Sequence, residues 1–139
     1  MAASIESRIH RTLEGLKRFR LCARWDQLPQ LDNIDPPLNA TERLLGAYEN
    51  VPGRADHILL FTNVGVHLWE DRGWRSLKYT DIAATEWPTE SKNEALTLVI
   101  RMKTGDHERL PILGGTELTR DLFEVMRFFD RVVEDMRQK

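Results

Sequence analysis

The chain has 139 residues, of which 41% are hydrophobic and 30% are charged. A chain of this length buries roughly two-thirds of its surface on folding, so it can form a core without metal or disulfide support. Its longest strictly apolar run, residues 58–61, is too short for a membrane-spanning helix. The net charge of −2 lacks the basic excess of a dedicated nucleic-acid-binding protein, so we expect no nucleic-acid partner.

The single cysteine, Cys22, permits no internal disulfide and no metal site made of cysteines alone. The first residues lack the apolar block of a secretory signal. We therefore expect a soluble, cytoplasmic protein.

The N-terminal segment differs from the rest of the chain in charge. Residues 1–24 carry six basic and two acidic side chains, whereas the remainder is acidic. Apolar residues recur at spacings of three and four, and Ser4 can act as an N-cap, which predicts an amphipathic helix over residues 5–24. This helix either docks on the acidic body of its own chain or binds an anionic membrane surface. The basic residues concerned are Arg8, Arg11, Lys17, Arg18, Arg20 and Arg24.

Residues 26–41 contain three prolines and three aspartates without a sustained period, which indicates an irregular connector along the domain surface. We predict an N-terminal extension, residues 1–41, followed by one domain, residues 42–139.

From residue 42 onward the apolar pattern shortens to strand-sized pieces separated by turn residues. Hairpin-length joints favour antiparallel pairing, because parallel pairing needs long crossovers. The sequence therefore predicts a seven-stranded antiparallel sandwich or barrel. Its strands are expected at residues 43–49, 57–62, 66–70, 74–79, 82–87, 95–103 and 107–113.

A second helix is expected after Gly114 and Gly115, with Thr116 as its cap. Its apolar stripe needs a partner surface, so we expect the helix to cover the open corner of the sandwich. The fold class is then α+β, mainly β. The stripe consists of Leu118, Leu122, Val125, Phe129, Val132 and Met136.

Two short motifs carry a family resemblance. One is Phe61, Thr62, Asn63, Gly65 and Val66, and the other is Tyr79, Asp81 and Ile82. With seven strands and a C-terminal helix, residues 42–137 resemble the pleckstrin-homology-like (PH-like) fold, in particular the small bacterial PH-like domains related to GRAM and YokE-type modules. These motif residues are folding residues, and Asn63 and Gly65 suit a hairpin that needs positive φ angles.

Several kinds of site find no support in the sequence. PH domains that recognise phosphoinositides use clustered Lys and Arg in their loops, whereas the corresponding loops here hold five acidic and two basic side chains. His57 and His107, with Asp56 and Asp106 beside them, lack the local spacing of metal motifs. With no nucleophile or phosphate-loop motif either, we expect no metal, no cofactor and no enzymatic activity.

Surface aromatics are more informative. The strand tryptophans Trp69, Trp74 and Trp87 exceed what the inward positions need, and residues 58–61 are apolar on both faces of their strand. Something must cover this outer face: the N-terminal helix, a partner protein or a second copy in a homodimer.

We therefore predict a non-enzymatic module that binds an unknown protein. The resemblance implies a groove between strand 82–87 and helix residues 120–131, with Trp87 as the leading anchor. One alternative is a peripheral membrane module bound through the basic N-terminal helix. Another is a small inhibitor or immunity-type protein with an acidic binding surface. The candidate partner-binding residues are Trp69, Trp74, Trp87, Arg120, Arg127 and Arg131.

Overall fold

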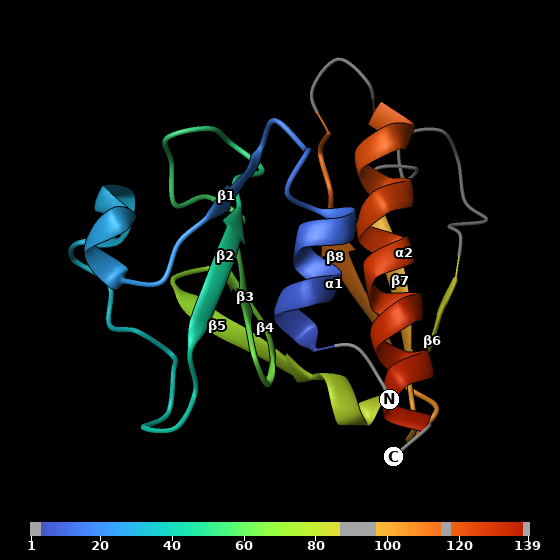
Figure 1. Ribbon diagram of the computed structural model, residues 1–139. Helices are drawn as coiled ribbons and strands as arrows, with labels where there is room; N and C mark the ends of the chain where they lie inside the picture. Colours follow the sequence, from blue (N-terminus) through green and yellow to red (C-terminus); the bar gives the residue numbers. More distant parts are fainter. Residues whose placement is uncertain (1–3, 87–96, 115–117, 138–139) are drawn as a thin grey trace. The chain divides into compact units, whose positions relative to one another are not determined.

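The computed structural model describes residues 4–86, 97–114 and 118–137 (Figure 1). The chain forms two compact units. The terminal unit is built from both ends of the chain, Met1–Leu16 and Tyr79–Lys139, and the central unit is the continuous segment Lys17–Lys78. The predicted division into an N-terminal extension, residues 1–41, and one domain, residues 42–139, is not tested by these units and stays a prediction.

The central unit contains a five-stranded antiparallel sheet in the order β1-β2-β3-β4-β5. Each strand pairs with its neighbour in the sequence, so short turns are sufficient for most connections. The strands are β1 (Phe19–Leu21), β2 (Leu44–Tyr48), β3 (Leu59–Thr62), β4 (Gly65–Glu70) and β5 (Gly73–Lys78).

The backbone angles of the hairpin turns agree only in part with those that the sequence predicted. Asp71 and Arg72 join β4 to β5, and their φ angles of 52° and 63° are those of a two-residue turn that matches the twist of the strands. The positive φ predicted at Asn63 and Gly65 is wrong, because neither residue adopts it. Gly65 is needed for another reason: a Cβ there would collide with the carbonyl oxygen of Leu77 in β5.

The connector covers one face of the central sheet. Two short 3-10 turns, η1 (Trp25–Gln27) and η2 (Pro29–Leu31), place Leu28 and Leu31 in full burial. These leucines form a core cluster with Leu44, Ala47, Ile58 and Leu60 of the sheet and with Cys22. The sequence left the cover of the outer face open among the N-terminal helix, a partner protein and a second copy, and did not consider the connector. The connector covers this face, because its leucines reach the sheet from successive tight turns.

The N-terminal helix is shorter than predicted. Helix α1 (Ile5–Thr12) begins at the predicted cap, where Ser4 Oγ accepts a hydrogen bond from Ser7 N at 3.1 Å. Gly15 follows its end, and Phe19 instead lies in β1, with its ring 5.7 Å from that of Phe61 in an edge-to-face contact. The predicted helix over residues 5–24 is therefore wrong beyond residue 12. In residues 13–24, strand pairing and the burial of Phe19 outweigh the helical spacing of the apolar residues.

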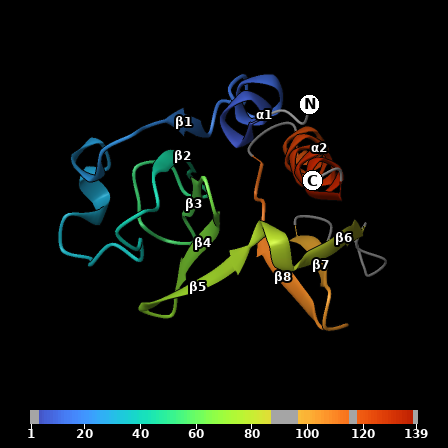
Figure 2. The ribbon, with the colours of Figure 1, turned by 60° about the horizontal axis from the view of Figure 1, so that its bottom comes forward.

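The terminal unit contains a three-stranded antiparallel sheet in the order β6-β7-β8, and α2 lies across one face of it (Figure 2). Helix α1 packs against α2. Tyr79 forms aromatic contacts with Phe128 and Phe129 of α2 in the core of this unit. The elements are η3 (Tyr79–Asp81), β6 (Ile82–Glu86), β7 (Thr97–Met102), β8 (His107–Pro111) and α2 (Leu118–Arg137).

The protein is thus α+β and mainly β, with antiparallel sheets and a C-terminal helix, as predicted. Each of the seven predicted strands is found within a few residues of its expected position. The finer prediction of one seven-stranded sandwich or barrel differs from the structure, because the described residues form two sheets, of five and three strands, that are not closed. The extra strand is β1, and the chain leaves β5 through η3 rather than continuing the first sheet. Among the described residues, neither helix has the length and apolar character needed to cross a membrane.

Candidate functional site

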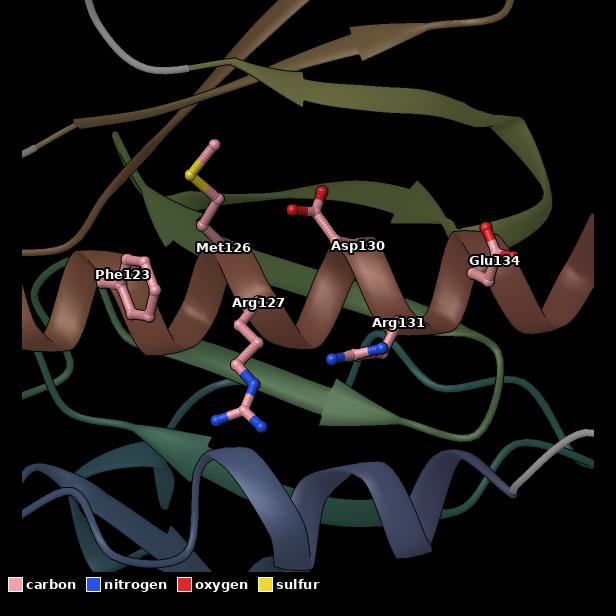
Figure 3. Close-up of a pocket in the computed structure, with 6 residues that line it drawn as sticks. All are labelled: Phe123, Met126, Arg127, Asp130, Arg131 and Glu134. Atoms are coloured by element: carbon pink, nitrogen blue, oxygen red, sulfur yellow. The ribbon is translucent and has the colours of Figure 1, made fainter.

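The outer face of α2 carries a cavity of about 500 Å³ (Figure 3). Its lining residues recur at spacings of three and four and therefore share one side of the helix. The opposite side is the predicted apolar stripe, of which Leu122, Val125, Phe129 and Val132 are buried. The cavity is lined by Phe123, Met126, Arg127, Asp130, Arg131 and Glu134, here named the α2 groove.

Apolar surface is concentrated at one end of the α2 groove. Phe123 is 52% exposed, the largest exposed fraction of any large hydrophobic residue in the described part of the chain, and Met126 beside it is half-buried. Exposure of a phenylalanine ring leaves apolar area in contact with water, which a partner side chain can cover. The groove therefore has a hydrophobic contact point.

The charged groups of the α2 groove point in different directions. In Figure 3, Met126 and Asp130 project towards β6, whereas Arg127 projects towards α1. Asp130 accepts a hydrogen bond from Thr85 Oγ1 of β6, which ties that carboxylate to the sheet. Arg127 lies 3.8 Å from Glu124, a loose pair on the helix surface, and Arg131 is exposed.

Strand β6 contacts α2 and forms one end of its sheet, because β7 is its only partner among the described strands. Its pairing is irregular between Ile82 and Ala84, and Arg137 of α2 donates a hydrogen bond to the carbonyl oxygen of Ala83 at 3.0 Å. An end strand offers backbone groups with which an extended peptide can pair.

The predicted partner-binding residues fall into separate groups. Trp69 and Trp74 lie in the central unit with their ring centroids 5.1 Å apart, and the ring of Trp25 in η1 packs edge-to-face on Trp74 at 6.2 Å. Trp74 Nε1 also donates to the carbonyl oxygen of Asp35 at 2.9 Å. These half-buried rings hold the connector against the sheet. Arg127 and Arg131 meet in the α2 groove of the terminal unit, Arg120 is exposed near the start of α2, and Trp87 lies outside the described residues.

The basic residues predicted for a lipid surface do not share one helix. Arg8 and Arg11 lie on α1, whereas the other four lie in the central unit. Arg8 is bound to Asp135 through two hydrogen bonds, and Arg11 and Lys17 are exposed. The remaining three are engaged in the pairs Arg18–Asn50, Arg20–Glu49 and Arg24–Asp26. The continuous cationic helix face on which the lipid alternative depends is therefore not formed.

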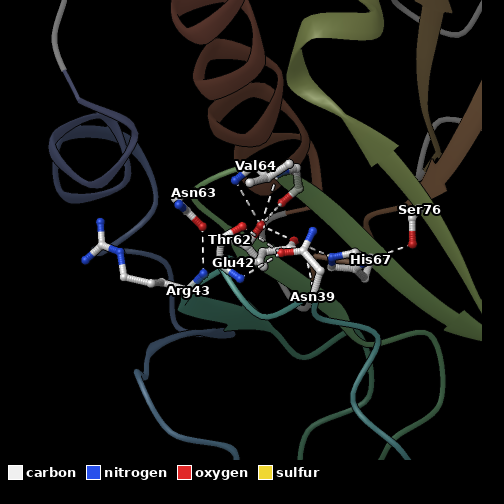
Figure 4. Close-up of polar contacts among 10 residues, drawn as sticks. Asn39, Glu42, Arg43, Thr62, Asn63, Val64, His67 and Ser76 are labelled. Carbon is white, nitrogen blue, oxygen red and sulfur yellow. Dashed lines mark hydrogen bonds and ion pairs between the residues drawn. The ribbon is translucent and has the colours of Figure 1, made fainter.

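A chain of short hydrogen bonds joins Ser76, His67 and Glu42 in the central unit (Figure 4). Ser76 Oγ lies 2.6 Å from His67 Nδ1, and His67 Nε2 lies 2.6 Å from Glu42 Oε2. Thr62 Oγ1 donates to the same carboxylate oxygen at 2.6 Å. The side chains of His67 and Glu42 are only 8% and 4% exposed, whereas Ser76 is an exposed residue of β5.

The environment of Glu42 favours its ionised form. Burial acts to raise the pKa of this carboxyl, but hydrogen bonds from Thr62 and His67 outweigh burial and leave the pKa below its usual value. An ionised Glu42 can only accept hydrogen bonds, so His67 Nε2 carries a proton towards it. The three residues thus combine a hydroxyl, an imidazole and a carboxylate in the order used for nucleophilic catalysis.

Sequence reasoning missed this constellation, although half of it was accessible. His67 and Ser76 are equidistant from the Asp71–Arg72 turn, and they are register partners across β4 and β5. A two-residue hairpin at that turn predicts the pair. No such rule places Glu42 beside them, because it belongs to the segment before β2 and lies 25 residues from His67 in the sequence.

The histidines tested as metal ligands lie in different units, with His57 3.8 Å from Glu70 and His107 3.3 Å from Glu86. Within the described ranges, no group of three or more His, Cys, Asp or Glu side chains is arranged to hold a metal ion.

Comparison with known proteins finds no matching family model, no matching curated protein and no matching solved structure.

Proposed function

We propose that the protein is a non-enzymatic binding module of PH-like type, which acts in the cytoplasm and takes an extended segment of another protein along the α2 groove and β6. The observation that carries this proposal is the cavity of about 500 Å³ on the outer face of α2, next to the half-exposed ring of Phe123. The order of elements from β2 to α2, seven strands and then a helix, supports the PH-like part of the proposal.

The position of β6 supports the binding mode. An incoming strand that pairs with an end strand gains main-chain hydrogen bonds, and its alternate side chains reach neighbouring pockets. Here α2 contacts β6, so the side chains of such a segment would meet Phe123 and Met126. Strand addition thus supplies affinity, and the helix supplies selectivity.

The charges of the groove define the chemistry of the partner. Asp130 is held by Thr85, while Arg127 and Arg131 are exposed on the same side of α2. Guanidinium groups bind carboxylates in paired hydrogen bonds. We therefore propose a partner segment that combines a large apolar side chain with acidic residues.

Selection from a library of random peptides tests this proposal, with the full chain immobilised as bait. The selected peptides should share an aromatic or large aliphatic residue near acidic residues. Titration calorimetry should show an affinity lowered by about tenfold or more for Phe123→Ala and for Arg127→Glu, because central aromatic and arginine contacts dominate binding energy.

Leu21→Ala is the matched control, because Leu21 is the other exposed large hydrophobic residue of the described chain, at 39% exposure, and lies in the central unit. This variant should bind the peptides like the wild type. Peptides without a shared pattern, or affinities unaffected by Phe123→Ala, would contradict the proposal.

Neither alternative gains support from a specific observation. Anionic-lipid binding by the N-terminal residues requires a cationic helix face over residues 5–24, whereas α1 ends at Thr12. Vesicle flotation with anionic lipid, comparing the wild type with Arg11→Glu/Lys17→Glu, remains its direct test.

A further inference from the structure

We propose that Ser76 is an activated nucleophile that accepts an acyl group from an activated ester, with His67 as its base and Glu42 as the residue that orients His67. This site lies in the central unit and does not depend on the α2 groove.

The direction of the hydrogen bonds supports the assignment. Glu42 Oε2 accepts hydrogen bonds from Thr62 Oγ1 and His67 Nε2, each at 2.6 Å. In the neutral imidazole, a proton on Nε2 leaves the lone pair on Nδ1. That lone pair faces Ser76 Oγ at 2.6 Å, so in this tautomer the hydroxyl donates a hydrogen bond to His67 Nδ1.

Burial divides the site into a protected part and an open part. The side chains of His67 and Glu42 are almost inaccessible to water, at 8% and 4% exposure, and their mutual orientation is fixed by Thr62. Ser76 stands at the open side, on the end strand β5, where an acyl donor can approach it. The base is thus preorganised, and the nucleophile is reachable.

The reaction is an acyl transfer with a complete balance of atoms and electrons. Ser76 Oγ forms a bond to the acyl carbon while its proton passes to His67 Nδ1. The bond between the acyl carbon and the leaving oxygen then breaks, and that oxygen keeps the electron pair. The proton passes from His67 to the leaving oxygen or to water, which leaves an ester on Ser76 and a neutral imidazole.

The test uses the full chain and p-nitrophenyl acetate as the acyl donor, with peptide mapping by mass spectrometry. Ser4 and Ser7, in the terminal unit, are internal controls because neither is hydrogen-bonded to a histidine within the part of the chain that the structure describes. A positioned general base contributes at least about a hundredfold, so Ser76 should be acetylated about a hundredfold faster than Ser4 or Ser7. Hydroxylamine should remove the adduct, since it cleaves esters and leaves lysine amides intact.

Variants assign the roles. Ser76→Ala should abolish this adduct, and His67→Gln should reduce its rate to that of Ser4. Leu21→Ala, an exposed position of the central unit outside this constellation, should leave the adduct unchanged. No residue of the α2 groove belongs to the constellation, so this proposal and the binding function fail independently. Equal acetylation of Ser76, Ser4 and Ser7 in the wild type would overturn the proposal even if the His67 variant does not fold, and would assign the constellation to structural support.

Discussion

Arg8 and Asp135 bind α1 to α2 through two hydrogen bonds, from Nε to Oδ2 at 2.7 Å and from Nη2 to Oδ1 at 2.8 Å. The residues are 127 positions apart in the sequence. The paired geometry fixes the guanidinium plane against the carboxylate, and Arg8 holds the pKa of Asp135 below its usual value.

Replacing Asp135 by Asn should lower the free energy of unfolding at neutral pH by roughly 1–3 kcal/mol, because Arg8 loses a charged partner in a partly buried position. Urea denaturation followed by circular dichroism measures this change. Asp26→Asn is the control, since the Arg24–Asp26 pair is exposed and should contribute less than about 1 kcal/mol. Equal effects of the two substitutions would contradict the role given to Asp135.

The carboxyl of Glu42 predicts acid sensitivity. A lowered pKa in the folded state contributes stability above the unfolded pKa, near 4.5, and this contribution is lost as the pH falls through the folded value. The difference in unfolding free energy between wild type and Glu42→Gln should therefore shrink as the pH falls below about 4.5. Denaturation curves across this range measure it, and a difference independent of pH would argue against an ionised Glu42.

The ring of Trp74 should matter for stability. It packs between Trp25 and Trp69 and bonds the connector at Asp35. Trp74→Ala should lower the free energy of unfolding by roughly 2–4 kcal/mol, somewhat less than for a fully buried tryptophan. Trp74→Phe should recover part of the loss. An unchanged melting temperature for Trp74→Ala would contradict this structural role and favour the predicted role of Trp74 in partner binding.

Gly65 should be intolerant of a side chain. Gly65→Ala should cost about 2 kcal/mol or more, because the new methyl group meets the backbone of β5 at Leu77. Gly73→Ala is the matched control in the next strand, where a Cβ has nothing within 4 Å, and its stability should stay within about 1 kcal/mol of the wild type. Thermal unfolding of both variants measures the difference. If the two replacements behaved alike, the close approach of β4 to β5 at Gly65 would be refuted.

Cys22 should react slowly in the folded protein. Burial raises the pKa of this thiol to about 11, although the charge of Arg20 opposes the shift. Compared with an unperturbed thiol at 9.0, the thiolate fraction at neutral pH is about a hundredfold lower. Alkylation by iodoacetamide should therefore be slow in buffer and fast in guanidinium chloride. Fast alkylation in buffer would place Cys22 outside the core.

Local patterns predicted the strands and α2 because hydrophobic period and turn residues agree there. In β7, Leu98 and Ile100 are fully buried and Arg101 is exposed. The same reasoning failed over residues 13–24, where apolar spacings of three and four fit a helix as well as they fit a turn followed by β1. Pairing with β2, more than twenty residues later, decided between the two.

The candidate sites depended even more on distant contacts. The PH-like resemblance, not a local pattern, implied a groove at helix residues 120–131, and Arg127 and Arg131 line the cavity on α2. The sequence predicted that the surplus tryptophans contact a partner, because no local pattern reveals that Trp25 and the connector reach Trp74. Glu42 escaped notice for the same reason.

The discontinuous composition of the terminal unit has a consequence for biosynthesis. The central unit is one uninterrupted stretch, so it can complete its sheet while the ribosome is still translating the codons for α2. Helix α1 is translated before the central unit, whereas α2, on which α1 packs, is translated after it. Until α2 is made, α1, whose Ile9 is fully buried in the finished protein, lacks the helix on which it packs. That interval is when the polypeptide is most open to aggregation or to a chaperone.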